Sequence, residues 1–121
     1  MKKIKVLIKK PGQRPYITYI SNTLSNLQKT VDGFIECVTL APDVVVICDE
    51  EGRLKDYPFC CCISGIEFVG TVVVVGCDKY GDFIDLPDNK FVKDLFTYLC
   101  DEDLYIDFFD PDELYSGIDD N

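Results

Sequence analysis

The side chains that could perform chemistry are carboxylates beside one turn and a set of thiols, because the 121-residue chain has no histidine. Asp49 and Glu50 are consecutive and Glu36 precedes them, so these carboxylates could act as acid and base or bind a divalent metal. Consecutive carboxylates beside a turn are far more often solvated than catalytic, and no other convergent polar group accompanies them. We expect no enzymatic activity, and a carboxylate enzyme using a divalent metal is a third alternative.

The chain also has seven cysteines. Cys60, Cys61 and Cys62 are consecutive, and side chains alternate along a strand, so at most Cys60 and Cys62 could bind one metal. The chain has no Cys-x-x-Cys pair, and a cysteine nucleophile would lack a histidine base. We therefore expect reduced, structural thiols, and we predict neither a metal site nor a cofactor.

The amino-terminal residues are basic and rich in strand-forming types. Residues 1–31 carry seven basic side chains and no acidic one. Residues 2–10 alternate in a way that predicts a strand with one apolar and one largely basic face, and its lysines suit the edge of a sheet. Residues 15–20 predict a second strand, so the two should form a hairpin whose loop holds Arg14.

Basic and aromatic side chains near this loop predict a binding site for an anion. Lys9, Lys10, Arg14 and Tyr16 could surround a negative charge, although a solvated basic face is the competing interpretation. The ligand we expect is a small anion such as a signalling nucleotide. The residues predicted to bind it are Arg14, Tyr16, Asn22 and Gln28.

The elements that must position these residues begin with a short helix. Leu24, Leu27 and Val31 recur at helical spacing, which predicts a helix over residues 23–32 with Asn22 as its N-cap and Gly33 as its left-handed C-cap. Apolar alternation then predicts a strand over 34–40. Residues 44–48 are β-branched and apolar without alternation, which indicates a strand buried on both faces.

The second half of the chain predicts the remaining elements. Residues 68–76 form another apolar run typical of a central strand, while residues 53–66 show no clear pattern. A short strand over 83–86 should pair back on the run before it. A helix capped by Asp88 should cover the sheet with the apolar stripe Phe91, Val92, Leu95, Phe96 and Leu99. The fold class we expect is α+β, with a mainly antiparallel sheet of five to six strands and two amphipathic helices.

The negative charge is concentrated at the carboxyl end. Net charge is −10, and residues 101–121 carry nine acidic side chains and no basic one. We expect a single α+β domain over residues 1–100 and an acidic, aromatic-containing tail over 101–121 that docks on the same chain or on a sister subunit in a homo-oligomer. The residues predicted to contact a partner are Asp101, Glu102, Asp103, Asp107, Phe108, Phe109 and Asp110.

Composition excludes several classes of protein. The chain is 47% apolar, which argues against disorder, and it lacks the roughly 18 consecutive apolar residues of a membrane span. The amino terminus does not have the apolar core and cleavage site of a signal peptide, so we expect a cytoplasmic protein. Partners are expected to be a small anion or a basic protein, without direct nucleic-acid or membrane binding.

Several short motifs are spread along the chain: Asn22, Leu24, Leu27-Gln28, Val31, Gly33, Ile35-Glu36, Val45-Val46-Ile47-Cys48, Glu50-Glu51-Gly52, Gly70-Thr71, Gly76 and Phe83-Ile84-Asp85-Leu86. Together they resemble an uncharacterised family of small single-domain proteins that occur on bacterial phages and conjugative elements. The resemblance spans roughly residues 3 to 87, and Pro58-Phe59-Cys60-Cys61-Cys62 stands where members place an asparagine-arginine pair.

The resemblance implies a mobile-element setting and no particular reaction. We expect a non-catalytic binding protein that acts in counter-defence by sequestering an anionic ligand. The alternative is a macromolecular decoy, whose acidic tail imitates nucleic-acid phosphates and occupies a basic site on a DNA-binding protein.

Overall fold

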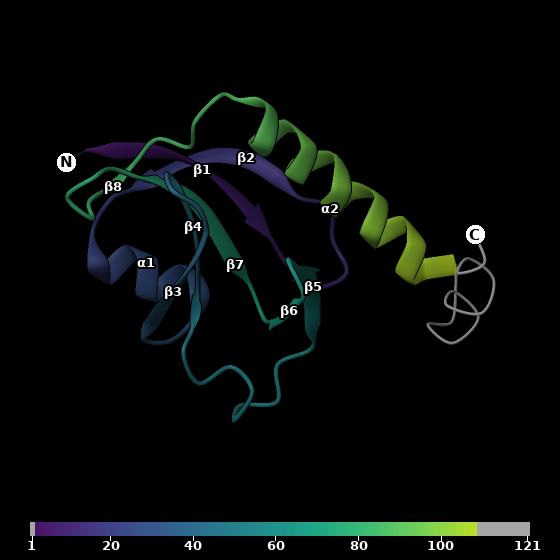
Figure 1. Ribbon diagram of the computed structural model, residues 1–121. Helices are drawn as coiled ribbons and strands as arrows, with labels where there is room; N and C mark the ends of the chain where they lie inside the picture. Colours follow the sequence, from purple (N-terminus) through teal and green to yellow (C-terminus); the bar gives the residue numbers. More distant parts are fainter. Residues whose placement is uncertain (1, 109–121) are drawn as a thin grey trace.

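The computed structural model describes the backbone of residues 2–108 and the side chains of residues 2–101 (Figure 1). The strands and helices, in chain order, are β1 (Lys3–Lys9), β2 (Tyr16–Ser21), α1 (Leu24–Val31), β3 (Ile35–Ala41), β4 (Val44–Asp49), β5 (Phe59–Ile63), β6 (Ile66–Val69), β7 (Val72–Cys77), β8 (Phe83–Ile84) and α2 (Lys90–Phe108). The expected α+β class is confirmed. No helix in this part of the chain is long and apolar enough to cross a membrane.

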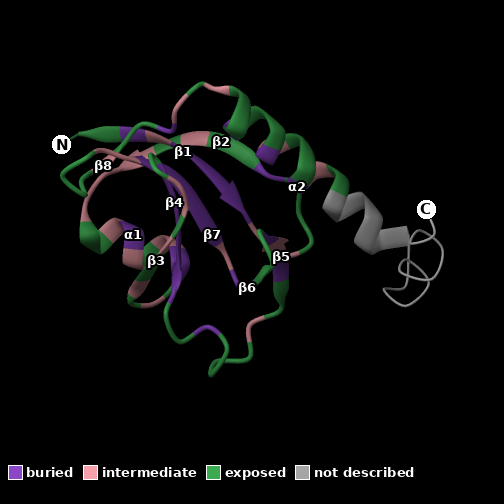
Figure 2. Ribbon diagram, in the orientation of Figure 1, coloured by how far each residue is buried: buried purple, intermediate pink, exposed green. Residues whose placement is uncertain are grey.

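The main sheet has six antiparallel strands in the order β2-β1-β7-β4-β3, with β8 paired to β7. Strands β4 and β7 lie in its middle, and Figure 2 shows both as buried strands. Their valine-rich sequences therefore lie where both faces are covered, as expected for residues 44–48. The prediction that β1 is an edge strand is wrong, because β1 lies between β2 and β7.

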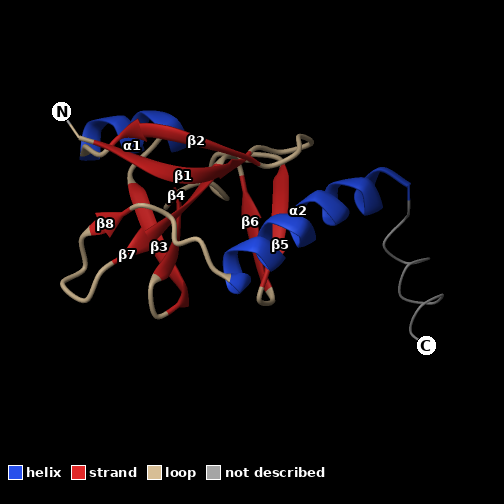
Figure 3. Cartoon of the chain, turned by 90° about the horizontal axis from the view of Figure 1, so that it is seen from above, coloured by secondary structure: helices blue, strands red, loops and turns tan. Residues whose placement is uncertain are grey.

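The two faces of the sheet are covered differently, and Figure 3 shows α1 and α2 on opposite sides of it. Helix α1 packs Leu27 and Val31 against one face. The other face is covered by the β5–β6 hairpin together with α2, through Val92, Leu95 and Leu99. The Tyr98 hydroxyl of α2 also donates to the Cys62 carbonyl of β5 at 2.6 Å.

The predicted strand over residues 68–76 is two strands in two sheets. The chain bends at Gly70, whose φ is +73°, so that β6 ends before the bend and β7 begins after it. Strand β6 pairs with β5 in a separate hairpin. Its two-residue loop, Ser64-Gly65, has positive φ at both positions, as a tight turn between twisted antiparallel strands requires.

The caps of α1 differ from those predicted. Thr23 is the N-cap of this helix, and its side chain accepts from the Asn26 N–H at 3.1 Å. Asn22 instead continues the strand, because its N–H donates to the Lys2 carbonyl at 2.9 Å. At the other end Asp32, not Gly33, adopts the left-handed conformation, with φ of 65°.

Helix α2 also begins differently, and it continues across the boundary predicted after residue 100. The Asn89 side chain accepts from the Val92 N–H at 3.0 Å, so Asn89 rather than Asp88 caps the first turn. From Lys90 the helix runs without a break to Phe108.

Candidate functional site

The structure does not bring the four predicted ligand-binding residues together. Tyr16 and Asn22 lie at opposite ends of β2, about 20 Å apart at the usual rise of a strand. Arg14 is exposed in the loop before Tyr16, whereas Gln28 lies on α1. Neither of the two cavities described below is lined by any of these residues.

Two of the side chains assigned to anion binding make internal contacts. Lys9 is fully buried, and its ammonium donates to the carbonyl oxygens of Lys10 at 3.0 Å and Cys60 at 3.4 Å. The β5–β6 hairpin covers this end of β1, which is why a lysine expected on an exposed face is inside. The Asn22 side-chain amide donates to the Phe83 carbonyl at 3.2 Å and so links β2 to β8.

The predicted partner-binding residues fall mostly outside the described side chains. Asp101 is exposed on α2. The side chains of Glu102, Asp103, Asp107 and Phe108 lie outside the described residues, as do Phe109 and Asp110 entirely.

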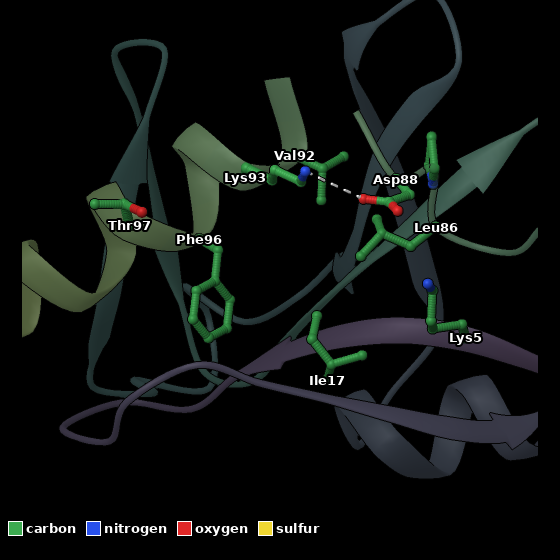
Figure 4. Close-up of a pocket in the computed structure, with 9 residues that line it drawn as sticks. Lys5, Ile17, Leu86, Asp88, Val92, Lys93, Phe96 and Thr97 are labelled. Atoms are coloured by element: carbon green, nitrogen blue, oxygen red, sulfur yellow. Dashed lines mark ion pairs between the residues drawn. The ribbon is translucent and has the colours of Figure 1, made fainter. Parts of the chain in front are cut away.

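A groove of about 360 Å³ lies between α2 and the β1–β2 pair (Figure 4). In Figure 4 the Phe96 ring points from α2 toward Ile17 of β2. The segment after β8 closes one end, since the Leu86 N–H donates to the Lys5 carbonyl at 2.9 Å. The groove is lined by Lys5, Ile17, Leu86, Pro87, Asp88, Val92, Lys93, Phe96 and Thr97.

The rim of this groove carries two lysines and one carboxylate. Lys93 and Asp88 form a long ion pair, with 3.8 Å between the ammonium and the carboxylate oxygen, and both side chains are about three-quarters exposed (73% and 78%). Exposed pairs of this kind contribute little stability, so the Lys93 ammonium can exchange Asp88 for another anion. With Lys5 half-buried beside them, the groove combines an apolar floor with a net positive rim.

The carboxylates considered for catalysis differ in their surroundings. Asp49 is buried, with its side chain 2% exposed, and it accepts from Lys55 Nζ at 2.8 Å and from the Glu51 N–H at 2.9 Å. Burial acts to raise the pKa of Asp49, but the hydrogen bonds from Lys55 and Glu51 and the charge of Lys55 outweigh it and hold that pKa below its ordinary value. Glu50 is exposed. Asp49 is thus engaged in holding the turn after β4.

Lys55 and Tyr57 join this carboxylate to the end of α1. The Lys55 ammonium donates to the Asp32 carbonyl at 3.0 Å, and the Tyr57 hydroxyl donates to the Asp32 carboxylate at 3.0 Å. A second cavity, of about 230 Å³, lies beside the turn between β3 and β6. Its polar lining comes mainly from Glu36, Asp49, Glu50, Arg53 and Glu67, so its balance of charge is negative.

The described residues contain no group of three or more cysteine, aspartate or glutamate side chains that could hold a metal ion. A bulge between Phe59 and Cys61 breaks the expected alternation, so that Cys60 and Cys61 are both buried. In β4, burial first and then the neighbouring charge of Glu36 raise the pKa of Cys48 to about 11. This thiol is therefore protonated, and a poor nucleophile, at neutral pH.

Among the comparisons with known proteins, only the comparison with family profiles gives a match. No curated protein and no solved structure matches the chain significantly. A family profile described as a domain of unknown function, DUF3846, matches residues 4–99, which include all of the strands except Lys3 of β1, and the part of α2 that packs on the sheet. The chain therefore belongs to the DUF3846 family.

Proposed function

We propose that this protein is a non-catalytic binding protein whose groove between α2 and β1–β2 holds a small organic anion with an aromatic ring, of which a nucleotide is the best example. The observation that supports this is the joint presence of Phe96, an apolar floor and two basic residues, Lys5 and Lys93, in the lining of one cavity. Sites for small molecules are mostly apolar with a few polar groups that fix orientation.

Each part of such a ligand has a matching part of the groove. A nucleobase would lie against the Phe96 ring and Ile17, since each of the nucleobases can stack on an aromatic ring. Its phosphate would replace Asp88 beside Lys93 at the rim. The cavity of about 360 Å³ is near the lower end of ligand sites, about 300–1,000 Å³, which favours a mononucleotide over a larger dinucleotide.

In the mobile-element setting that the family resemblance implies, binding a ligand without converting it would be sufficient for function. A phage or conjugative element that encodes a protein able to sequester a signalling nucleotide would weaken a defence response that depends on that nucleotide. We infer that counter-defence by sequestration is the role of this chain.

Isothermal calorimetry with a panel of nucleoside mono-, di- and cyclic phosphates tests the proposal. We expect at least one to bind, and Lys93→Glu to weaken its binding about tenfold, which corresponds to about 1.4 kcal/mol. Lys90→Glu is the matched control, because Lys90 is on the same helix, pairs with Asp94 and does not line the groove. Its affinity should equal that of the wild type.

Two results would count against the groove. One is the absence of heat and of thermal stabilisation with every nucleotide at millimolar concentration, and the other is equal weakening by Lys93→Glu and Lys90→Glu. Salt-sensitive capture of a basic protein, lost when residues 101–121 are removed, would instead favour the decoy.

A further inference from the structure

Strand β2 has an outer edge that is suited to pairing with another strand. It ends the order of the main sheet, and no described strand pairs with that edge. Its sequence, Tyr-Ile-Thr-Tyr-Ile-Ser, contains none of the lysines or prolines with which proteins normally protect an exposed edge. Tyr16, Ile17 and Tyr19 are also 39%, 44% and 59% exposed. Such an edge favours association.

The hydrogen bonds on the inner side show which backbone groups point outward. The Asn22 N–H donates to the Lys2 carbonyl, so Asn22 and Lys2 form a hydrogen-bonded pair in the β1–β2 ladder. Hydrogen-bonded pairs alternate along an antiparallel ladder, so the even-numbered residues of β2 bond to β1. The N–H and C=O groups of Ile17, Tyr19 and Ser21 therefore point to the open edge.

We propose that β2 pairs antiparallel with β2 of a second copy of this chain, with Thr18 opposite Thr18 at a two-fold axis. In this register Ile17 of each copy faces Tyr19 of the other, and both residues present outward N–H and C=O groups. The two pairs exchange about four backbone hydrogen bonds. Tyr16 and Ile20 also face each other, so over residues 16–20 every pair except the central one joins an aromatic to a β-branched side chain, which is a favourable cross-strand combination.

The neighbouring symmetric registers are less favourable. Placing Tyr19 opposite Tyr19 sets Ile17 against Ser21, whose carbonyl already accepts from the Thr23 N–H at 3.0 Å and the Asn26 side chain at 3.1 Å. Placing Ile17 opposite Ile17 sets Tyr19 against Pro15, which has no N–H to donate. In the Thr18-centred register the two hydrogen-bonded pairs next to the axis are therefore complete, and Ser21 and Pro15, which face each other, lie at the ends of the pairing.

The pairing also completes the groove, and this step rests on the proposed function. Residues 17 and 19 lie on the same face of β2, and Ile17 lines the groove beneath α2. Tyr19 of the partner subunit would stand beside Ile17 on that face. Each groove would gain a second aromatic ring, contributed by the other copy, opposite Phe96.

Sedimentation velocity on the full chain without ligand tests the dimer independently of nucleotide binding. An edge contact of this size is at the low end of specific interfaces, so we expect a rapid monomer–dimer equilibrium between roughly 10 µM and 1 mM. Tyr19→Lys should yield monomer throughout this range, because it removes the aromatic half of two pairs and places a charge on the edge.

Two further variants make the result specific. Tyr80→Lys makes the same substitution at a tyrosine that is 77% exposed in the turn before β8, and it should leave the dimer unchanged. Tyr19→Pro removes the outward N–H together with the aromatic ring but no bond to β1 and adds no charge, so it should weaken the dimer at least tenfold while circular dichroism shows a folded chain.

Three outcomes would overturn the proposal. They are a wild type that stays monomeric up to about 1 mM, where even weak edge contacts should be populated, a dimer that survives Tyr19→Lys, and a dimer that forms only after residues 109–121 are removed. The last result would mean that residues 109–121, rather than a second copy, occupy the edge of β2.

Discussion

At the scale of single residues, the tightest constraint lies where α1 ends and the turn after β4 begins. A Cβ built on Gly33 would be 2.4 Å from the carboxylate carbon of Asp49, so only glycine fits between that side chain and the backbone. The sequence indicated that Gly33 was special, but for the wrong reason. Asp32 takes the positive φ that glycine was expected to supply, since aspartate tolerates that conformation, and Gly33 provides space instead.

A double-mutant cycle tests this contact. Gly33→Ala should destabilise the fold by about 2 kcal/mol, because the new methyl group overlaps a buried carboxylate. In an Asp49→Ala background the same change should cost less than about 1 kcal/mol, since the overlapping group is gone. Urea unfolding followed by circular dichroism measures both. Equal costs in the two backgrounds would show that Gly33 does not press on Asp49.

The pH dependence of stability reports on Asp49. Its pKa is lower in the folded protein than its ordinary value of about 3.9, so the carboxylate stabilises the fold above that pH and loses this contribution as pH falls through the folded pKa. Asp49→Asn should be less stable than the wild type at neutral pH by about 1–2 kcal/mol.

The difference in unfolding free energy between the wild type and Asp49→Asn should shrink on acidification below about pH 4. Urea titrations of both proteins between about pH 6 and pH 3 check it. A difference that stays constant across this range would mean that Asp49 is not charged, or not paired with Lys55, in the folded protein.

At the scale of elements, patterns with a strong period or a long β-branched run were predictable, and boundaries were not. Residues 44–48 were identified correctly because a run of valines suits a strand covered on both faces. The β5–β6 hairpin was missed, although Ser64-Gly65 between two isoleucines is a turn signal that could have found it. The lysines of β1 were interpreted as exposed residues of an edge strand. Lys9 is in fact buried under the β5–β6 hairpin, and no local pattern in the sequence shows that the hairpin lies there.

Helix capping gives a prediction at this scale. Asn89→Ala should destabilise the protein by about 1 kcal/mol, because the Val92 N–H loses its acceptor at the start of α2. Asp88→Ala, one residue earlier, should cost less than about 0.5 kcal/mol, since the Asp88 side chain is exposed and, among the described residues, makes only the long contact with Lys93. Thermal unfolding of the two variants compares them, and the reverse order of stability would restore Asp88 as the cap.

At the scale of the whole molecule, the groove depends on tertiary structure that no local pattern reveals. Its walls come from β1 and β2, from the segment after β8 and from α2, which are far apart in the sequence. Phe96 was predicted to lie in the apolar stripe of its helix, and it does pack against the same core as Val92, Leu95 and Leu99. Its position above Ile17, beside Lys5 and Lys93, follows only from how α2 crosses the sheet.

The most direct test of the proposed groove is an NMR titration of the ¹⁵N-labelled protein with adenosine monophosphate and with the nucleotides that calorimetry selects. The account predicts that amide shifts cluster at Lys5, at Ile17 and along Val92 to Thr97, and that they saturate together. Shifts confined to the loop around Arg14 or to the cavity beside Asp49, or no shifts at millimolar nucleotide, would contradict it.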